Sequence, residues 1–327
     1  MPCRRSRGRV ALAAIARWET QYAPEWLAYH REIGFEHVYL ICNDDDPSAL
    51  WEAVLPFTAG ATPFVTFTHF PSRGHRFHML LEALRQAAEA YPWVMILDLD
   101  EFLHLTKCHD IERSLEPWES EWDVIHFNRI GFGHGGFAER PPGGVLRTYV
   151  RRQRDLTPIT RPLMRTARLM LEPAPDLAPI WTDPSSILIP AARQADALGR
   201  VMPEPPRPPF DQQVSERIRA RGLVHHYQFK SEQDFLLRPA RGQQGAFGGQ
   251  ALWRRLYEEG QHRAILAELS AVEDRSLAHF WEDRLSARAR RSTLLPKPEM
   301  PNLALGKAAT QSSVSEWSCS RDPAEDA

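Results

Sequence analysis

The sequence predicts an α/β protein with a mostly parallel sheet and helices on both of its faces. Short apolar runs alternate with segments of helical periodicity through the first hundred residues, a pattern typical of strands joined by right-handed helical crossovers. One apolar run, residues 93–97, ends abruptly in three carboxylates, Asp98, Asp100 and Glu101. Open α/β sheets bind their ligands at the carboxyl ends of the strands, so this run marks the predicted site.

The predicted elements of the first hundred residues follow from periodicity, turn residues and the positions of proline. In chain order they are a strand over 10–16, a helix that begins near Pro24 and ends at Gly34, a strand over 37–42, a helix over 47–57, a strand over 64–70, a helix over 75–91 and the strand over 93–97. The helix over 75–91 carries five apolar side chains at helical spacing. We therefore expect one of its faces to pack against the sheet.

Later parts of the chain give weaker signals. We expect a strand over 122–127, irregular structure over the glycine- and proline-rich residues 131–144, and a long connection over 171–210. Helical periodicity returns over 251–269 and 276–290, which predicts a helical C-terminal end.

The composition is that of an ordinary globular protein. It is 43% apolar and 25% charged, and 40 basic residues nearly balance 42 acidic ones, so no global field favours nucleic acid. The arginine-rich stretch 147–168 is interpreted as a solvated face or an acceptor-side surface. The four cysteines form no C-x-x-C pair, which argues against a disulfide scaffold. His104, Cys108 and His109 are interpreted as helix-flanking residues, because no fourth zinc ligand lies nearby.

The N-terminus resembles a secretion signal only in part. Arginines precede the apolar run 10–15, but that run is short and is followed by Arg17 and Glu19 instead of a small-residue cleavage site. No segment approaches the roughly 18 apolar residues that a membrane span requires. The predicted location is cytoplasmic, with peripheral association at the inner face of the membrane left open.

The acidic residues after strand 93–97 predict a divalent metal site. Side chains alternate along a strand, so Asp98 and Asp100 are expected to point to the same side of the sheet. Carboxylate oxygens suit Mg²⁺ or Mn²⁺, which usually take one or two protein carboxylates and complete their shells with substrate phosphates and water. The predicted ligand is a metal-bridged diphosphate. The alternative is a strand followed by a solvated acidic turn.

Two stretches, WETQYAPEWLAYHREIGFEHVYLICNDDDPS at 18–48 and WVMILDLDEF at 93–102, resemble the glycosyltransferase families with a GT-A fold, particularly families 2 and 92. The resemblance implies a GT-A fold with a Rossmann-like sheet. It implies that Glu19, Asn43 and Asp44 contact the nucleotide. Those families carry Asn-Glu at the end of the first strand, whereas this chain has Trp18-Glu19.

A second match, LVHHYQFKSEQDF at 223–235, resembles the H-Y-x-x-K-S segment near the end of the same catalytic domain. It implies that His226 completes the metal shell and that Lys230 neutralises the diphosphate. Imidazole suits Mn²⁺, and an ammonium suits phosphate as a point charge. The alternative is that His225 and His226 are ordinary strand residues.

Together these features predict a metal-dependent glycosyltransferase that transfers a sugar from a UDP- or GDP-sugar to a glycan, glycolipid or other hydroxyl acceptor. Mn²⁺ or Mg²⁺ is held by Asp100 and His226 together with Asp98, which contacts the ribose or a metal-bound water. Glu101 of the same motif is a further candidate catalytic residue. The resemblance implies inversion, which needs a base at the acceptor hydroxyl; Asp183, Glu172 and His134 are candidates for that base.

Two other function classes remain open. A nucleotidyltransferase also uses paired acids and a metal, but it normally needs a glycine-rich basic signature near its first strand. A non-catalytic glycan-binding protein is suggested by the tail, PNLALGKAATQSSVSEWS, which resembles the opening of a discoidin domain. We expect a catalytic domain over 1–290, a linker over 291–301, and an incomplete discoidin-like β-sandwich over 302–327 that is too short to close a core.

Overall fold

The computed structural model describes residues 9–71, 76–171, 193–202, 212–237 and 250–294. The chain divides into two compact units, Met1–Asp283 and Arg284–Ala327. The sheet and the candidate site belong to the first unit. The described part of the second unit is the end of one helix, α11 (Ser276–Leu294). The predicted discoidin-like tail lies outside the described residues.

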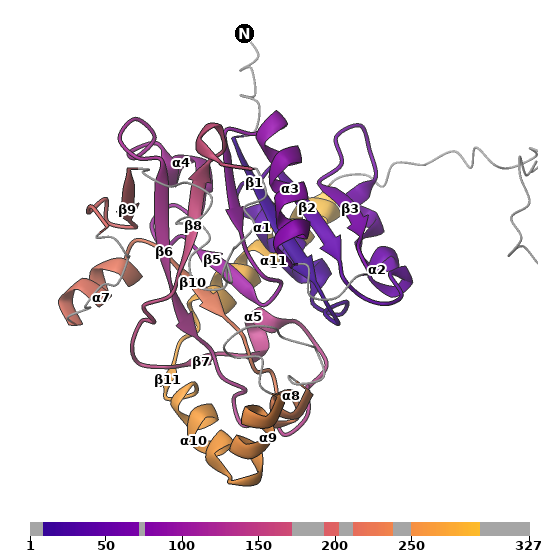
Figure 1. The fold of residues 1–327 in the computed structure, drawn as a ribbon, viewed down its shortest axis with the longest axis vertical. Helices are drawn as coiled ribbons and strands as arrows, with labels where there is room; N and C mark the ends of the chain where they lie inside the picture. Colours follow the sequence, from indigo (N-terminus) through magenta and orange to yellow (C-terminus); the bar gives the residue numbers. More distant parts are fainter. Residues whose placement is uncertain (1–8, 72–75, 172–192, 203–211, 238–249, 295–327) are drawn as a thin grey trace, which may run out of the picture. The chain divides into compact units, whose positions relative to one another are not determined.

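Nine of the described strands form one sheet in the order β3-β2-β1-β4-β8-β6-β10-β5, with β9 paired to β6 (Figure 1). Their bounds are β1 Val10–Ala16, β2 His37–Cys42, β3 Val65–His69, β4 Trp93–Ile96, β5 Glu101–His104, β6 Val124–Gly131, β8 Thr160–Arg165, β9 Gln194–Asp196 and β10 Leu223–His226. Among them only β8 and β5 run against the common direction. The predicted fold class, α/β with a mostly parallel sheet flanked by helices, is confirmed.

Strand β1 explains why the sheet carries helices on both faces. All seven of its residues are buried, which is typical of a parallel strand covered on each side. Alternate residues of β1 belong to two separate apolar clusters. Val10, Leu12, Ala14 and Ala16 pack with α1 (Ala23–Glu32), and Ala11, Ala13 and Ile15 pack with α3 (Arg76–Ala90). The amphipathic face predicted for the helix over 75–91 therefore covers β1, β2 and β4.

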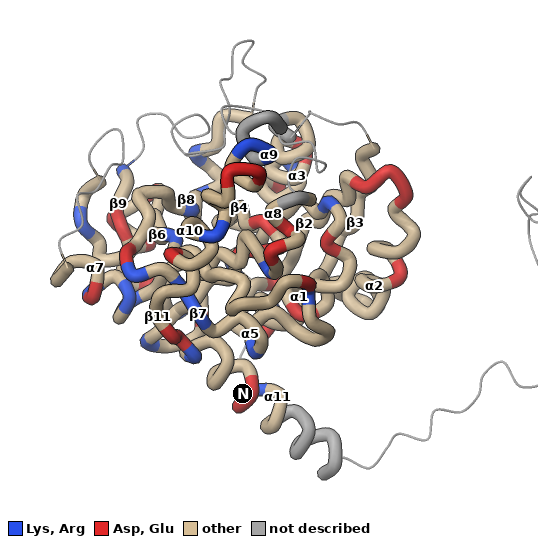
Figure 2. The backbone as a smooth tube through the Cα atoms, turned by 90° about the horizontal axis from the view of Figure 1, so that it is seen from below, with Lys and Arg blue, Asp and Glu red and all other residues tan. Residues whose placement is uncertain are grey.

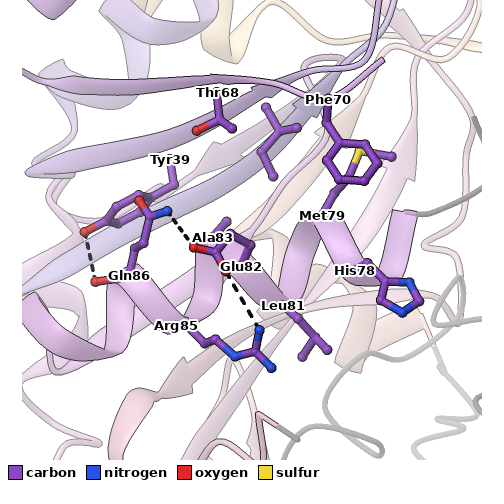
Figure 3. A pocket seen from close by; sticks show the side chains of 11 residues that line it. Tyr39, Thr68, Phe70, His78, Met79, Leu81, Glu82, Ala83, Arg85 and Gln86 are labelled. Atoms are coloured by element: carbon purple, nitrogen blue, oxygen red, sulfur yellow. Dashed lines mark hydrogen bonds and ion pairs between the residues drawn. The ribbon is translucent and has the colours of Figure 1, made fainter. Parts of the chain in front are cut away.

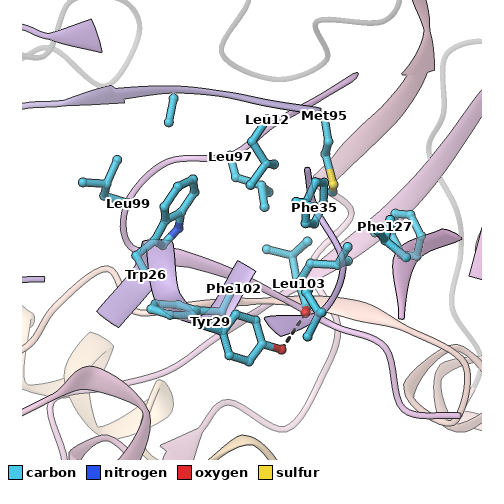
Figure 4. Close-up of a cluster of buried hydrophobic side chains, with 14 of the residues drawn as sticks. Leu12, Trp26, Tyr29, Phe35, Met95, Leu97, Leu99, Phe102, Leu103 and Phe127 are labelled. Atoms are coloured by element: carbon cyan, nitrogen blue, oxygen red, sulfur yellow. Dashed lines mark hydrogen bonds between the residues drawn. The ribbon is translucent and has the colours of Figure 1, made fainter. Parts of the chain in front are cut away.

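Helix α1 anchors the acid-tipped segment of the chain. The indole N–H of Trp26 donates to the backbone oxygen of Glu101 at 2.7 Å, and the Tyr29 hydroxyl donates to the backbone oxygen of Leu103 at 2.7 Å. Both aromatic rings are fully buried, and the Tyr29 ring lies edge-on to Phe102 (Figure 4). Buried polar atoms on aromatic rings normally find such partners, and here those partners fix β5 against α1.

Most elements predicted for the first hundred residues are confirmed closely. Strands β1 and β2 have the predicted bounds, and α1, α3, β3 and β4 differ from prediction by one or two residues at an end. Helix α2 spans Ser48–Thr58, and Gly34 ends α1 with a φ of 95°. Strand β6 begins two residues later than predicted and runs on to Gly131.

The interpretation of residues 147–168 as a solvated face is wrong for its second half. Residues Thr160–Arg165 form β8, which pairs antiparallel with both β4 and β6. Leu163 and Met164 are fully buried. The many arginines of this stretch suggested exposure to solvent. Arg161 and Arg165 of the strand are instead paired with carboxylates, so their charges are compensated within the protein. His104 is likewise a residue of β5 and not a helix-flanking residue.

The C-terminal part of the first unit is helical, as predicted. The expected helix over 251–269 is two helices, α9 (Gln250–Glu258) and α10 (Gln261–Glu268), separated at Gly260, whose φ is 72°. A small sheet of β7 (Arg151–Arg152) and β11 (Val272–Glu273) precedes α11. Helix α11 includes residues 291–294 of the predicted linker. No helix within the described ranges is long and apolar enough to cross a membrane.

Acid is expected to destabilise the fold, because several buried histidines, among them His30, His104 and His225, must remain neutral. Burial lowers the pKa of His30 to about 3 and that of His104 to about 4. His30 donates from Nδ1 to the backbone oxygen of Trp26. A histidine with a depressed folded-state pKa binds more protons in the unfolded chain between that pKa and about 6.5. Its stabilising contribution is therefore complete above about pH 6.5 and is lost as the pH falls toward 4.

We expect the free energy of unfolding to fall by roughly 2 kcal/mol per histidine between pH 7 and pH 5. Urea unfolding at the two pH values measures this loss. His30→Gln should make the pH-dependent loss smaller than in the wild type. A His30→Gln variant with the wild-type pH dependence would contradict the assignment.

Candidate functional site

Polar side chains follow the ends of five strands at the carboxyl edge of the sheet. Strands β1, β2, β4, β6 and β10 end there, and the antiparallel strands β5 and β8 begin there. The residues following these strand ends include most of those predicted from sequence: Glu19, Asn43, Asp44, Asp98, Asp100, His134 and Lys230. His226 is the last residue of β10.

Asp100 and His226 are brought together although 126 positions separate them. His226 Nε2 lies 3.6 Å from Oδ2 of Asp100, and the two side chains are 12% and 13% exposed. The backbone fixes this approach, because Tyr227 N–H donates to the Asp100 backbone oxygen at 2.8 Å and His226 pairs with Glu101 across β10 and β5. A carboxylate and an imidazole therefore face each other at the edge of the sheet.

Glu101 has a different setting from Asp100. Its carboxylate is fully buried and accepts from two arginines, Arg161 Nε at 2.6 Å and Arg129 NH1 at 2.9 Å. Although burial opposes the charged form, the carboxylates of Glu101 and Asp98 hold the pKa of Arg161 above its usual value. Burial lowers the pKa of Arg129, with the neighbouring Arg161 charge acting in the same direction. This arrangement favours a positioning role for Glu101 over contact with substrate.

Asp98 is linked to the same arginine pair. Its Oδ2 accepts from Arg161 NH2 at 3.2 Å, and its backbone N–H donates to Glu101 at 3.2 Å. Its side chain is 26% exposed, twice the fraction of Asp100. Arg161 thus fixes one oxygen of Asp98, whereas Asp100 faces His226.

A divalent cation fits these residues as a partly protein-bound ion. In the described part of the chain no group of three or more His, Cys, Asp and Glu side chains is arranged to hold a metal. Asp100 and His226 supply two donors, one oxygen and one imidazole nitrogen. Ions such as Mg²⁺ and Mn²⁺ use one or two protein carboxylates and complete their coordination with phosphates and water. The donor set therefore fits an ion that arrives with its substrate.

The turn after β2 contains Asn43 and Asp44, which the sequence resemblance predicts to contact the nucleotide. Asn43 and Asp44 are 7% and 8% exposed. The Asn43 side-chain amide donates to the backbone oxygen of Phe70 at 2.6 Å, and Asp44 Oδ1 accepts from the Trp18 N–H at 2.7 Å. Glu19 is 7% exposed at the start of the turn into α1. The structure places these residues just beyond the ends of β1 and β2, and β1 is the strand that pairs with β4.

Lys230 is buried, and a second cation that the sequence did not reveal lies near it. The Lys230 ammonium donates to the Tyr227 backbone oxygen at 3.0 Å and lies 4.5 Å from the centre of the Tyr22 ring. Arg140 lies 5.6 Å from the same ring centre and pairs with Asp234. Lys230 is 2% exposed, whereas the Arg140 side chain is 23% exposed. Arg140 is therefore the more accessible cation.

The sequence positions of Arg140 and Asp234 could have marked them as candidate site residues. Arg140 belongs to the glycine- and proline-rich residues 131–144, and Asp234 follows the K-S segment by three residues. Their pairing joins these two stretches, since the backbone N–H groups of Glu232 and Gln233 donate to oxygens of the same loop. Basic and acidic segments are interspersed along the tube in Figure 2. Positive charge at the site thus comes from individual side chains.

His134 follows β6 by three residues. Burial lowers its pKa, so its imidazole is neutral near pH 7, and its Nδ1 is buried without a hydrogen-bond partner among the described atoms. Gly133 next to it packs tightly, because a Cβ there would lie 2.8 Å from the carbonyl carbon of Leu269. Close packing against the C-terminal end of α10 therefore accounts for this glycine. Asp183 and Glu172 lie outside the described residues.

A hollow of about 270 Å³ lies elsewhere, between α3 and strands β2 and β3 (Figure 3). Its lining is mainly apolar and includes Tyr39, Phe70 and Met79. Glu82 and Arg85 of α3 pair at its margin, 3.8 Å apart. None of the site residues predicted from sequence lines this hollow. It is therefore distinct from the Asp100–His226 site.

No family model matches the chain, and no curated protein matches it. Among solved structures it is similar to S. aureus TarS 1–349, with 13% identity over 80% of this chain and 70% of that chain and a TM-score of 0.34. It is also similar to the same TarS fragment in complex with UDP-GlcNAc, with 15% identity over 49% of this chain and 46% of that chain and a TM-score of 0.33. A third similar structure is CMP:2-keto-3-deoxy-manno-octonic acid synthetase complexed with CTP, with 14% identity over 37% of this chain and 53% of that chain and a TM-score of 0.26. All three TM-scores lie below 0.5, so these likenesses give no support to a particular function.

Proposed function

We propose that the chain is a divalent-metal-dependent glycosyltransferase with a GT-A fold that uses a nucleoside diphosphate sugar. The observation that carries this proposal is the approach of His226 to Asp100 within 3.6 Å at the carboxyl edge of the sheet. The two residues come from sequence segments that independently resemble the GT-A families. A structural strand pair would require neither a carboxylate nor an imidazole at this edge.

Each residue of the site has a defined part in this function. Asp100 and His226 would hold Mn²⁺ or Mg²⁺, which when bound offsets the negative charge that develops on the leaving diphosphate. Arg140, which pairs with Asp234, would contact the outer phosphate oxygens, and the buried Lys230 ammonium would contribute a second positive charge. Asn43 and Asp44 lie at the end of β2, where a nucleoside can be held.

The transfer breaks the bond between the anomeric carbon and the diphosphate oxygen. A new bond forms between that carbon and the acceptor oxygen, and the acceptor hydroxyl loses its proton to a base. His134 is our candidate for the base, because burial lowers its pKa and keeps the neutral imidazole available near pH 7. Direct displacement by the acceptor inverts the anomeric centre. The proposed acceptor is a glycan or a glycolipid, and the proposed location of the reaction is the cytoplasm or the inner face of the membrane.

Nucleotide binding should depend strongly on the metal. Without an ion, a diphosphate would face Asp98 and Asp100 unscreened, a repulsion worth several kcal/mol at partly buried distances. Calorimetry with UDP and GDP, in Mn²⁺ and in excess chelator, measures this dependence. We expect binding in Mn²⁺ and a loss of at least about tenfold in chelator. Equal affinity under both conditions would contradict the metal assignment.

The reaction itself separates this function from its alternatives. Incubation with a panel of nucleotide sugars, Mn²⁺ and simple glycosides should release nucleoside diphosphate and extend the acceptor. A nucleotidyltransferase would instead consume a nucleoside triphosphate and a sugar phosphate and release pyrophosphate. A non-catalytic glycan-binding protein would bind glycan with no effect of nucleotide or metal. Either of these outcomes would overturn the proposal.

A further inference from the structure

Trp18 lies at the carboxyl edge of the sheet in a backbone conformation that bulky residues disfavour. Its φ is 58°, and among the described non-glycine residues only Trp18 and His109 have a positive φ. Left-handed backbone at such a residue is costly and persists only where the surroundings impose it, most often at binding sites. The turn from β1 into α1 therefore holds Trp18 against a local conformational cost.

The turn after β2 contacts both Trp18 and Arg17. The Trp18 N–H donates to Oδ1 of Asp44 at 2.7 Å. The Arg17 guanidinium lies 5.0 Å from the centre of the indole ring, donates to the Asn43 backbone oxygen and approaches Asp45 at 3.9 Å. The indole and the turn after β2 are therefore positioned as one unit.

The ring is held at the surface although it could stabilise a core. Trp18 is 41% exposed, whereas Ala16 and Glu19 on either side of this turn are 0% and 7% exposed. A tryptophan is the largest apolar side chain available for burial, so its exposure forgoes that stabilisation. A rigid, exposed aromatic ring is a surface on which a flat heterocycle can stack, and every nucleic-acid base offers such a face.

The position of the ring selects the kind of ligand. Strand β1 lies between β2 and β4 in the sheet, and neighbouring strands are about 4.8 Å apart. Trp18 thus follows the strand next to the one that leads to Asp100, and it contacts the turn that holds Asn43. A ligand that combines a flat heterocycle at β1 and β2 with phosphates at the end of β4 is a nucleoside diphosphate.

We propose that the Trp18 indole stacks on the base of the nucleotide donor. The ring supplies affinity for the nucleoside that is separate from the affinity supplied by the metal-bound phosphates. This inference rests on the proposed function, because it requires a nucleoside diphosphate at the site. Removing one aromatic–base stack should weaken binding by about tenfold to a hundredfold.

Calorimetry in Mn²⁺ with UDP, GDP, ADP, CDP and inorganic pyrophosphate tests this role. Trp18→Asn is the main variant, because asparagine adopts the left-handed conformation readily and the backbone should not move. We expect Trp18→Asn to weaken the affinity for the tightest-binding nucleotide about tenfold to a hundredfold and to leave the affinity for pyrophosphate unchanged. Trp51→Asn is the matched control, since Trp51 on α2 is 40% exposed and packs on Phe67. It should bind every ligand as the wild type does.

Trp18→Phe keeps a stacking ring and should keep most of the nucleotide affinity while losing the nucleotide-induced change in tryptophan fluorescence. Unchanged nucleotide affinity in Trp18→Asn, or an equal loss for nucleotide and pyrophosphate, would overturn the stacking role. An increase in acceptor KM with unchanged nucleotide affinity would overturn it too, by placing Trp18 on the acceptor side. A wild-type chain that binds neither nucleotide nor pyrophosphate in Mn²⁺ would instead overturn the proposed function.

Discussion

Asp100→Asn is expected to reduce sugar transfer by more than a hundredfold while the free energy of unfolding changes by less than about 1 kcal/mol. Asparagine keeps the shape of the side chain but removes the charge that, in the proposed function, attracts the ion. Loss of a group that only supports a metal ligand typically costs tenfold to a hundredfold in activity or metal affinity, so loss of a ligand should cost more. Transfer rates at saturating Mn²⁺, together with urea unfolding, measure the two effects.

His226→Ala should have nearly the same effect through a different segment of the chain. If both side chains bind one ion, the double variant should be scarcely worse than either single variant, because residues that act as a unit are not additive. His279→Ala, at an exposed position of α11, provides a matched control and should transfer normally. Multiplicative losses, or a His226→Ala variant with normal Mn²⁺ dependence, would show that His226 is only a strand residue.

Glu101→Gln is expected to destabilise the fold by about 3–5 kcal/mol. The substitution leaves Arg129 and Arg161 without the buried carboxylate that compensates them, and breaking a buried ion pair from one side typically costs this much. Urea unfolding at pH 7 measures the change. Glu116→Gln, at an exposed position, should alter the free energy of unfolding by less than about 0.5 kcal/mol.

This substitution also distinguishes the two roles considered for Glu101. A positioning residue should lose stability, and the remaining folded enzyme should show a changed Mn²⁺ requirement because Arg161 no longer holds Asp98 in place. A Glu101→Gln variant of normal stability whose transfer is abolished would show that Glu101 acts on the substrate directly. The positioning role of Glu101 would then be wrong.

The sequence predicted the local elements and the edge of the sheet at which the acids lie. Strand β1 is apolar throughout, β2 is mainly apolar after His37, and both are bounded by turn residues, so their apolar runs were sufficient to predict them. The approach of His226 to Asp100 has no local signal, and only the resemblance of two distant segments suggested it. The metal role of the pair stays a prediction.

The arginine pair around Glu101 could not have been predicted in the same way. Arg129 and Arg161 lie 28 and 60 positions beyond Glu101, and their approach depends on β8 entering the sheet between β4 and β6. The second and third residues of β8 are a buried arginine and a proline, and in a sequence such a pair is typical of an exposed loop. The Arg140–Asp234 pair was missed for a related reason, since it joins an irregular loop to a helix 94 positions away.

The placement of β10 has a consequence for the order in which the chain can fold. Strands β1 and β2 pair across one short crossover, with Ala11 opposite His37. Strand β10 pairs over a much longer stretch of the sequence, because His226 lies opposite Glu101 of β5. Loop-closure entropy delays such distant pairings. The pairing of β1 with β2 is therefore expected to form early, and the approach of His226 to Asp100, which needs β10, is expected to form late.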